Sequence, residues 1–232
     1  MTLYSLAGTA SRRLSDALIH LRIARLARFT NGHASERELS GWYWRDYRRE
    51  SERVADLDVE LYLLVRAFRP GRVVETGVNR GHSTAAILRA LAHNGNGGSL
   101  TSIDLPTTDP AGRVNADGRR DGAWIPDGLT GCEVPEFLRG RWTLLLGDAK
   151  ELLPRVEPGY DFFFHDSDHS YPHQRFEYEE AFGALAPGGI LASDDVNWTP
   201  AWREMTGWLP RERAFAWTRM TPQRGAVRVV QP

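Results

Sequence analysis

From residue 56 onward, the hydrophobic positions alternate between helical spacing and short continuous runs. Apolar residues at helical spacing predict helices over residues 56–68, 83–93, 173–185 and 202–209. Short apolar runs bounded by glycine, proline or aspartate predict seven strands, over residues 71–76, 100–103, 141–146, 162–164, 190–192, 214–220 and 226–231. Alternating strands and helices predict an α/β fold, a doubly wound and mostly parallel seven-stranded sheet with helices on both faces. The last two strands follow each other through residues 221–225, so the final strand is expected to run antiparallel.

The N-terminal residues 1–55 form a separate helical arm in this prediction, and residues 56–232 form the main domain. In the segment Ser11 to Phe29, Leu14, Leu18, Leu21, Ile23 and Leu26 lie near one helical face, opposite a row of arginines. We expect this helix to pack on the domain or on a second subunit, which favours a homo-oligomer, a dimer or larger. Attachment to an anionic membrane surface is the alternative.

Residues 106–140 interrupt the alternation with a long stretch rich in glycine, proline and aspartate. A loop of this length in a compact domain is typically functional or disordered. We interpret it as a lid-like insertion over the pocket of the acceptor substrate.

The composition excludes several classes of protein. The 232 residues carry a net charge of −1, so no basic field indicates nucleic acid as a partner. Cys132 is the single cysteine, which excludes an internal disulfide and a cysteine-rich metal site. No apolar stretch approaches the roughly 20 residues of a membrane span, and no signal peptide is recognisable. We therefore expect a cytoplasmic protein without stable membrane insertion.

A glycine-containing loop between the strand over residues 71–76 and its helix predicts a cofactor site. Gly77 and Gly81 let backbone N–H groups and a helix N-terminus approach a ligand, and Ser83 opens that helix. Glu75, at the end of the strand, can accept hydrogen bonds from a hydroxyl or ammonium group. A dinucleotide site would need a further glycine and would be repelled by Glu75, whereas S-adenosylmethionine carries no phosphate.

Two further acids follow strands at the same predicted edge. Asp104 ends the second strand, where an acid can accept both ribose hydroxyls of a nucleotide-like cofactor. Asp148 follows the third strand and precedes Ala149, where it can cap the next helix.

Titratable residues cluster after the fourth and fifth strands. The run YDFFFHDSDHSY places His165, Asp166, Asp168 and His169 at the strand end, and four such groups are costly to bury without a task. Asp194 and Asp195 follow the next strand. Asp166, Asp194 and Asp195 thus converge from adjacent strand ends, and such hard oxygen ligands suit Mg²⁺, with Mn²⁺ and Fe²⁺ as alternatives.

These motifs resemble those of a known family. The pattern of Glu75, Gly77, Gly81 and Ser83 resembles the first motif of class I S-adenosylmethionine-dependent methyltransferases. DFFFHDSDHSY followed by APGGILASDDV looks like the metal-dependent O-methyltransferases of the macrocin type, which act on sugars and macrolides. The similarity covers residues 70–196.

The resemblance implies roles for individual residues. Asp166, Asp194 and Asp195 would hold the metal, and His169 would be the general base. Asp148 and the backbone N–H of Ala149 would contact the adenine ring. Catechol-type relatives carry asparagine where Asp195 stands, so this sequence follows the sugar-modifying type there.

The resulting hypothesis is a methyltransferase that uses S-adenosylmethionine and a divalent cation to methylate a hydroxyl of a small molecule. A sugar or another vicinal diol of a natural product is the expected acceptor, because two adjacent hydroxyls could bind one cation. A metal-dependent hydroxylase on the same fold is one alternative. A non-catalytic cofactor-binding partner of another methyltransferase is the other, while a nicotinamide-dependent oxidoreductase is disfavoured by Glu75 and the missing glycine.

Overall fold

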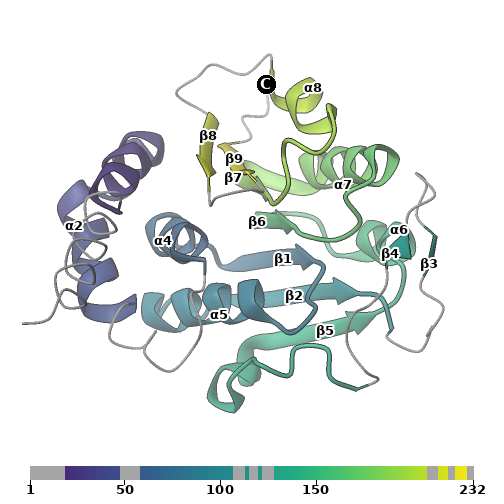
Figure 1. Ribbon diagram of the computed structural model, residues 1–232. Helices are drawn as coiled ribbons and strands as arrows, with labels where there is room; N and C mark the ends of the chain where they lie inside the picture. The colour runs from purple at the N-terminus through teal and green to yellow at the C-terminus, as the bar shows by residue number, and fades with distance from the viewer. Residues whose placement is uncertain are drawn as a thin grey trace, which may run out of the picture.

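A seven-stranded sheet forms the centre of the molecule (Figure 1). The computed structural model describes residues 19–47, 58–106, 113–114, 120–121, 128–207, 214–218 and 223–228. The strand order across the sheet is β5 (Trp142–Leu146), β2 (Ser99–Asp104), β1 (Arg72–Thr76), β6 (Tyr160–His165), β7 (Leu185–Ser193), β9 (Gln223–Arg228) and β8 (Ala214–Thr218). The first five are parallel, and β9 is antiparallel to both of its neighbours. The predicted doubly wound sheet with an antiparallel last strand is confirmed.

Side chains alternate between two hydrophobic cores, one on each face of the sheet. Val73 and Phe162 face a core shared with α4 (Val59–Phe68), α5 (His82–Asn94) and η2 (Glu136–Arg141). Val74 and Phe163 face the opposite core, which contains residues of α6 (Ala149–Leu152), η3 (Leu153–Arg155), α7 (Tyr171–Ala184) and α8 (Ala201–Thr206). Successive side chains of a strand point to opposite faces, so continuous apolar runs in these strands indicate burial on both sides.

The described part of the N-terminal arm packs on the α4 and α5 side. Residues 19–30 are helical, and Ile23, Leu26 and Phe29 are buried in the core with α4. Leu21 is 64% exposed, so its assignment to the apolar face was wrong. The buried stripe instead follows the i, i+3, i+4 spacing from Ile19. Leu14 and Leu18 lie outside the described residues.

Two short helical segments complete the arm. In α2 (Glu36–Gly41), Ser35 and Glu38 form a reciprocal capping box. The π-helix η1 (Trp42–Tyr47) follows without a break, and its Tyr47 packs its ring 5.2 Å from that of Tyr62 in α4. This ring contact packs η1 against the domain.

Only parts of the region 106–140 are described. Two short strands, β3 (Arg113–Val114) and β4 (Arg120–Asp121), pair with each other outside the main sheet. Residues 128–140 pack against the start of α5 and against β5. The lid function of this region stays a prediction.

Some boundaries differ from those predicted. The strand predicted over residues 190–192 begins at Leu185 and runs through Pro187 and its two glycines, with a register shift where it pairs with Tyr160 and Phe162. β9 begins three residues before the predicted start at residue 226. Among the described residues, no helix is long and apolar enough to cross a membrane.

Candidate functional site

The carboxyl ends of the five parallel strands bring the candidate residues together. Each residue beyond a strand end continues the backbone hydrogen bonding to the neighbouring strand: Gly77 N donates to Ile103 O, Asp166 N to Thr76 O, and Asp194 N to His165 O, at 2.8, 2.8 and 2.9 Å. The glycine loop after β1 therefore lies between Asp104, which ends β2, and Asp166. Ligands of open α/β sheets bind in the crevice at this edge.

The glycine loop has a backbone shape that other residues would not allow. Gly77 has φ +81°, and a Cβ atom there would lie 2.0 Å from the carbonyl oxygen of Asp166. Gly81 has φ +94° and precedes α5, whose first turn contains no acidic residue and no capping side chain. The N-terminus of this 13-residue helix therefore keeps its positive end available to a negative group.

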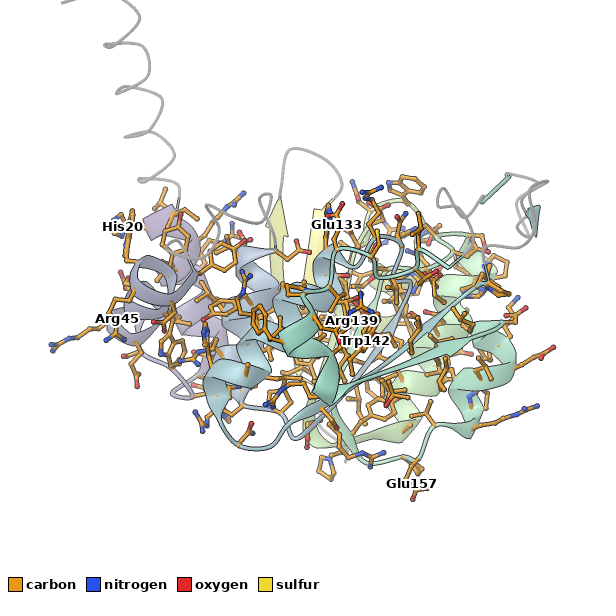
Figure 2. The ribbon with its side chains drawn as sticks, turned by 90° about the horizontal axis from the view of Figure 1, so that it is seen from below. His20, Arg45, Glu133, Arg139, Trp142 and Glu157 are labelled. Carbon is orange, nitrogen blue, oxygen red and sulfur yellow. The ribbon has the colours of Figure 1, made fainter. Side chains whose placement is uncertain are left out.

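Residues 131–134 form backbone hydrogen bonds to the outer side of this loop. Gly131 N donates to Asn79 O at 2.8 Å, and Glu133 N donates to Arg80 O at 2.9 Å. The Glu133 carboxylate also contacts the side chains of Arg80 and His82. Figure 2 labels Glu133 together with Arg139 of η2 and Trp142 of β5. The Arg139 guanidinium donates a hydrogen bond to the carbonyl of Gly131 and lies over the Trp142 ring.

Glu75 is directed into the protein. Its carboxylate is fully buried and accepts hydrogen bonds of 2.7 Å from Ser83, Thr84 and Ser102. Burial raises the pKa of Glu75 to about 7, against the lowering effect of these hydroxyls. In this arrangement Glu75 and Ser83, both predicted cofactor ligands, bind each other across the base of the glycine loop.

Asp104 and Asp148 lie at this same carboxyl edge of the sheet. Asp104 is the last residue of β2, and Asp148 follows β5. Asp104 Oδ2 accepts from the backbone N–H groups of Val78 and Asn79, at 3.1 and 2.9 Å, so it bridges its strand to the glycine loop. Burial raises its pKa. Asp148 caps α6 by accepting from Lys150 N, the capping role anticipated from the sequence, and Ala149 follows as the first residue of that helix.

The three aspartates predicted as metal ligands form one acidic cluster. Asp194 and Asp195 are buried, and Asp195 adopts φ +47°. The pKa of Asp166 is raised well above its usual range. Burial is the largest cause, and the negative charges of Asp194, Glu75 and Asp195 raise it further. Burial and Asp194 likewise raise the pKa of Asp195 to about 7. The cluster is therefore electrostatically unfavourable until a positive charge compensates it.

His169 lies beside this cluster. Its Nε2 atom is 3.5 Å from Asp195 Oδ2 and 3.9 Å from Asp166 Oδ1, beyond hydrogen-bonding range. Burial lowers the pKa of His169 to about 3, so the ring is neutral. His169 Nε2 and Asp195 Oδ1 are both buried without a hydrogen-bond partner.

A second polar network, centred on Glu177 of α7, was not predicted. His173 Nε2 forms a hydrogen bond of 2.7 Å with Glu177 Oε1. Glu177 also accepts a hydrogen bond from Nδ1 of His165 at 2.6 Å. The spacing of four residues between His173 and Glu177 on one helix was the signal in the sequence.

The strand order and the ligand-binding edge together define the class of protein, a Rossmann-like methyltransferase fold. Residues 74–196 match the family described as a methyltransferase domain, which is more than half of the chain. The chain belongs to this family. A comparison with curated proteins finds no match.

Solved structures share the fold. The O-methyltransferase TomG from Streptomyces achromogenes, involved in tomaymycin synthesis and in complex with SAM, is 17% identical, with a TM-score of 0.54 over 83% of this chain and 89% of TomG. The O-methyltransferase from Bacillus cereus in complex with SAH is 19% identical, with a TM-score of 0.52 over 82% of this chain and 90% of its own. At these identities the similarity establishes the common fold.

Proposed function

We propose that this protein transfers the methyl group of S-adenosylmethionine to a hydroxyl oxygen of a small molecule, with the help of a divalent cation. The observation that carries the proposal is the hydrogen bond from Asp166 N to Thr76 O. It sets the acidic cluster directly beside the glycine loop, so that one crevice can hold a cofactor on one side and an acceptor on the other.

The cofactor half of the site is assigned to the loop and the two strand ends beside it. The positive N-terminus of α5 suits the carboxylate of the cofactor's amino acid end. Asp104 suits the ribose hydroxyls, and Asp148 with Ala149 suits the adenine ring. The two similar structures were obtained with SAM or SAH, which supports this choice of cofactor.

The acidic cluster fits a divalent cation by its chemistry. Among the described residues, no group of three or more His, Cys, Asp or Glu side chains is placed so that it could hold a metal ion without rearrangement. The unpartnered Asp195 Oδ1 and the mutual repulsion of the three aspartates nevertheless favour a hard cation, with Mg²⁺ as the first choice. Asp166, Asp194 and Asp195 would hold it.

The reaction joins the acceptor oxygen to the methyl carbon while the bond from that carbon to sulfur breaks. A bound cation would lower the pKa of the acceptor hydroxyl, so that even a weak base can remove its proton. His169 is neutral, and its unpartnered Nε2 can take this proton. The products are a methyl ether, S-adenosylhomocysteine and a proton, which His169 passes to water.

Trp198 favours an acceptor with a ring. Its side chain is 56% exposed, and its ring centroid lies 5.3 Å from that of His169. A hydrogen bond from Trp198 N to Asp195 O, at 3.0 Å, fixes the turn that carries it. An exposed indole beside the proposed base offers a flat surface to a sugar or phenol ring that bears two adjacent hydroxyls.

Turnover assays with chelated protein test the proposal. The protein is incubated with S-adenosylmethionine and a panel of sugar and phenol diols, with Mg²⁺ or with EDTA, and S-adenosylhomocysteine is quantified. We expect product only with the cation, and loss of product in Asp194→Ala although cofactor binding persists. Full activity in EDTA would contradict the role of the cation, and product that requires oxygen would indicate hydroxylation instead.

A further inference from the structure

Glu177 is a fully buried carboxylate that accepts hydrogen bonds from four different side chains. Its Oε2 accepts hydrogen bonds from Thr76 Oγ1 of β1, at 2.5 Å, and from His165 Nδ1, at 2.6 Å. Its Oε1 accepts hydrogen bonds from Ser167 Oγ, at 2.8 Å, and from His173 Nε2, at 2.7 Å. A carboxylate has about four lone-pair positions, so this one is saturated.

The partners of Glu177 surround the acidic cluster. His165 and Ser167 are the residues on either side of Asp166, and Thr76 is the residue whose backbone oxygen bonds Asp166 N. Glu177 therefore fixes both flanks of Asp166 without itself contacting the proposed cation or cofactor. Every donor in the network is directed at one side chain on the buried face of α7.

The same network extends to His169. The His165 ring lies edge-on to the His169 ring, with centroids 5.2 Å apart and planes inclined by 67°. Because Glu177 is an acceptor, Nδ1 of His165 carries the proton, and this bond sets the orientation of the ring on which His169 packs. Although burial acts to raise it, the pKa of Glu177 is held far below its usual range by His165 and His173, so the carboxylate is ionised.

We propose that Glu177 is the positioning residue for the acidic cluster, holding Asp166 and His169 in place through Ser167 and His165. The inference rests on the proposed function, because it assigns Glu177 to the cation and base side of the same site. Residues that orient ligands in this way typically change metal affinity or activity by about 10- to 100-fold when replaced.

The test compares Glu177→Gln with Glu179→Gln, a substitution of an exposed glutamate on the same helix. Mn²⁺ binding is measured by electron paramagnetic resonance with S-adenosylmethionine present at saturation, cofactor affinity by calorimetry, and unfolding by circular dichroism. We expect Glu177→Gln to bind Mn²⁺ about 10- to 100-fold more weakly, with cofactor affinity within about threefold of the wild type. Glu179→Gln should match the wild type in all three measurements.

Ser167→Ala removes one of the four bonds and keeps the test decisive if Glu177→Gln does not fold. We expect it to weaken Mn²⁺ binding by a few fold, again without a change in cofactor affinity. Unchanged Mn²⁺ binding in the folded variants, or equal losses of Mn²⁺ and cofactor affinity, would overturn the positioning role. Wild-type protein that binds the cofactor but no Mn²⁺ would instead overturn the proposed cation site.

Discussion

Glu75 is a carboxylate whose surroundings differ strongly from water. It is buried among three hydroxyls, and its pKa of about 7 exceeds the ordinary value of 4.5. The raised value means that its favourable contribution to stability is complete below about pH 4.5 and is lost as the pH rises through about 7.

We expect Glu75→Gln to abolish this pH dependence. Between pH 4.5 and pH 8, the free energy of unfolding of the variant should gain roughly 3 kcal/mol relative to the wild type, because glutamine stays neutral. Urea unfolding of both cofactor-free proteins at several pH values measures the difference, with the exposed Glu179→Gln as control. Parallel profiles for wild type and Glu75→Gln would show that Glu75 is ionised throughout.

Trp198 permits a second test at the residue scale. We expect Trp198→Ala to raise the KM for a ring-bearing acceptor by roughly tenfold, or about 1.4 kcal/mol, because the stacking surface is lost. Trp198→Phe should restore most of the affinity, and cofactor binding should not change in either variant. Phe137→Ala, at an exposed aromatic position on η2, is the control; an equal effect of that substitution would contradict a local role for Trp198.

The position of the candidate residues at one edge of the sheet was predictable where it follows from the strand pattern. Asp104, Asp166 and Asp194 each follow an apolar strand, and parallel strands bring their ends to one edge. The burial of Glu75 was not predictable in the same way, because Ser102 reaches it from a strand 27 residues later. The Glu177 network depends on helix α7 packing over the end of β6, which no local pattern specifies.

At the scale of elements, the glycine loop and the loop after β6 form one packed unit. A Cβ atom on residue 77 would overlap the backbone of Asp166, and this backbone cannot rotate away as a side chain would. Gly97 has a similar φ of +76° but no atom within 4 Å of the corresponding position. A substitution at Gly97 therefore measures the energetic cost of the left-handed backbone alone. A substitution at Gly77 measures that cost together with the cost of the overlap with the Asp166 backbone.

We expect Gly97→Ala to lower Tm by only a few degrees, since a left-handed alanine costs about 1–2 kcal/mol. Gly77→Ala should lower Tm further and weaken S-adenosylmethionine binding by at least about tenfold, because Asp166 must move away from the loop. Differential scanning fluorimetry and calorimetry measure the two effects. Equal behaviour of the two variants would contradict a tight contact between the loops.

Element types were predicted better than element boundaries. The strand β7 passes through Pro187 and two glycines, which normally end an element, and its pairing with β6 shifts register at the same place. The described helix of the arm, over residues 19–30, packs on the domain, although Leu21 points to solvent. An error of one residue in the predicted apolar stripe of a helix rotates its predicted buried face. Which face is buried depends on tertiary packing.

At the scale of the whole molecule, the two hydrophobic cores leave one edge of the sheet for function. α4 and α5 cover one face and α6, α7 and α8 cover the other, so polar groups gather where the strands end (Figure 1). This arrangement follows from alternating strands and helices and was the most predictable feature of the chain. Assembly of a homo-oligomer through the arm stays a prediction.

The most direct measurement is a calorimetric titration of metal-free protein with S-adenosylmethionine, repeated with Mg²⁺ and with the variants Asp104→Ala and Asp166→Ala. We expect one cofactor site per chain in the wild type with or without Mg²⁺ and nearly the same affinity in Asp166→Ala. Asp104→Ala should lose about tenfold or more in affinity, because it removes the carboxylate proposed to bind the ribose hydroxyls. Absence of binding under every condition would contradict the assignment of the crevice to this cofactor.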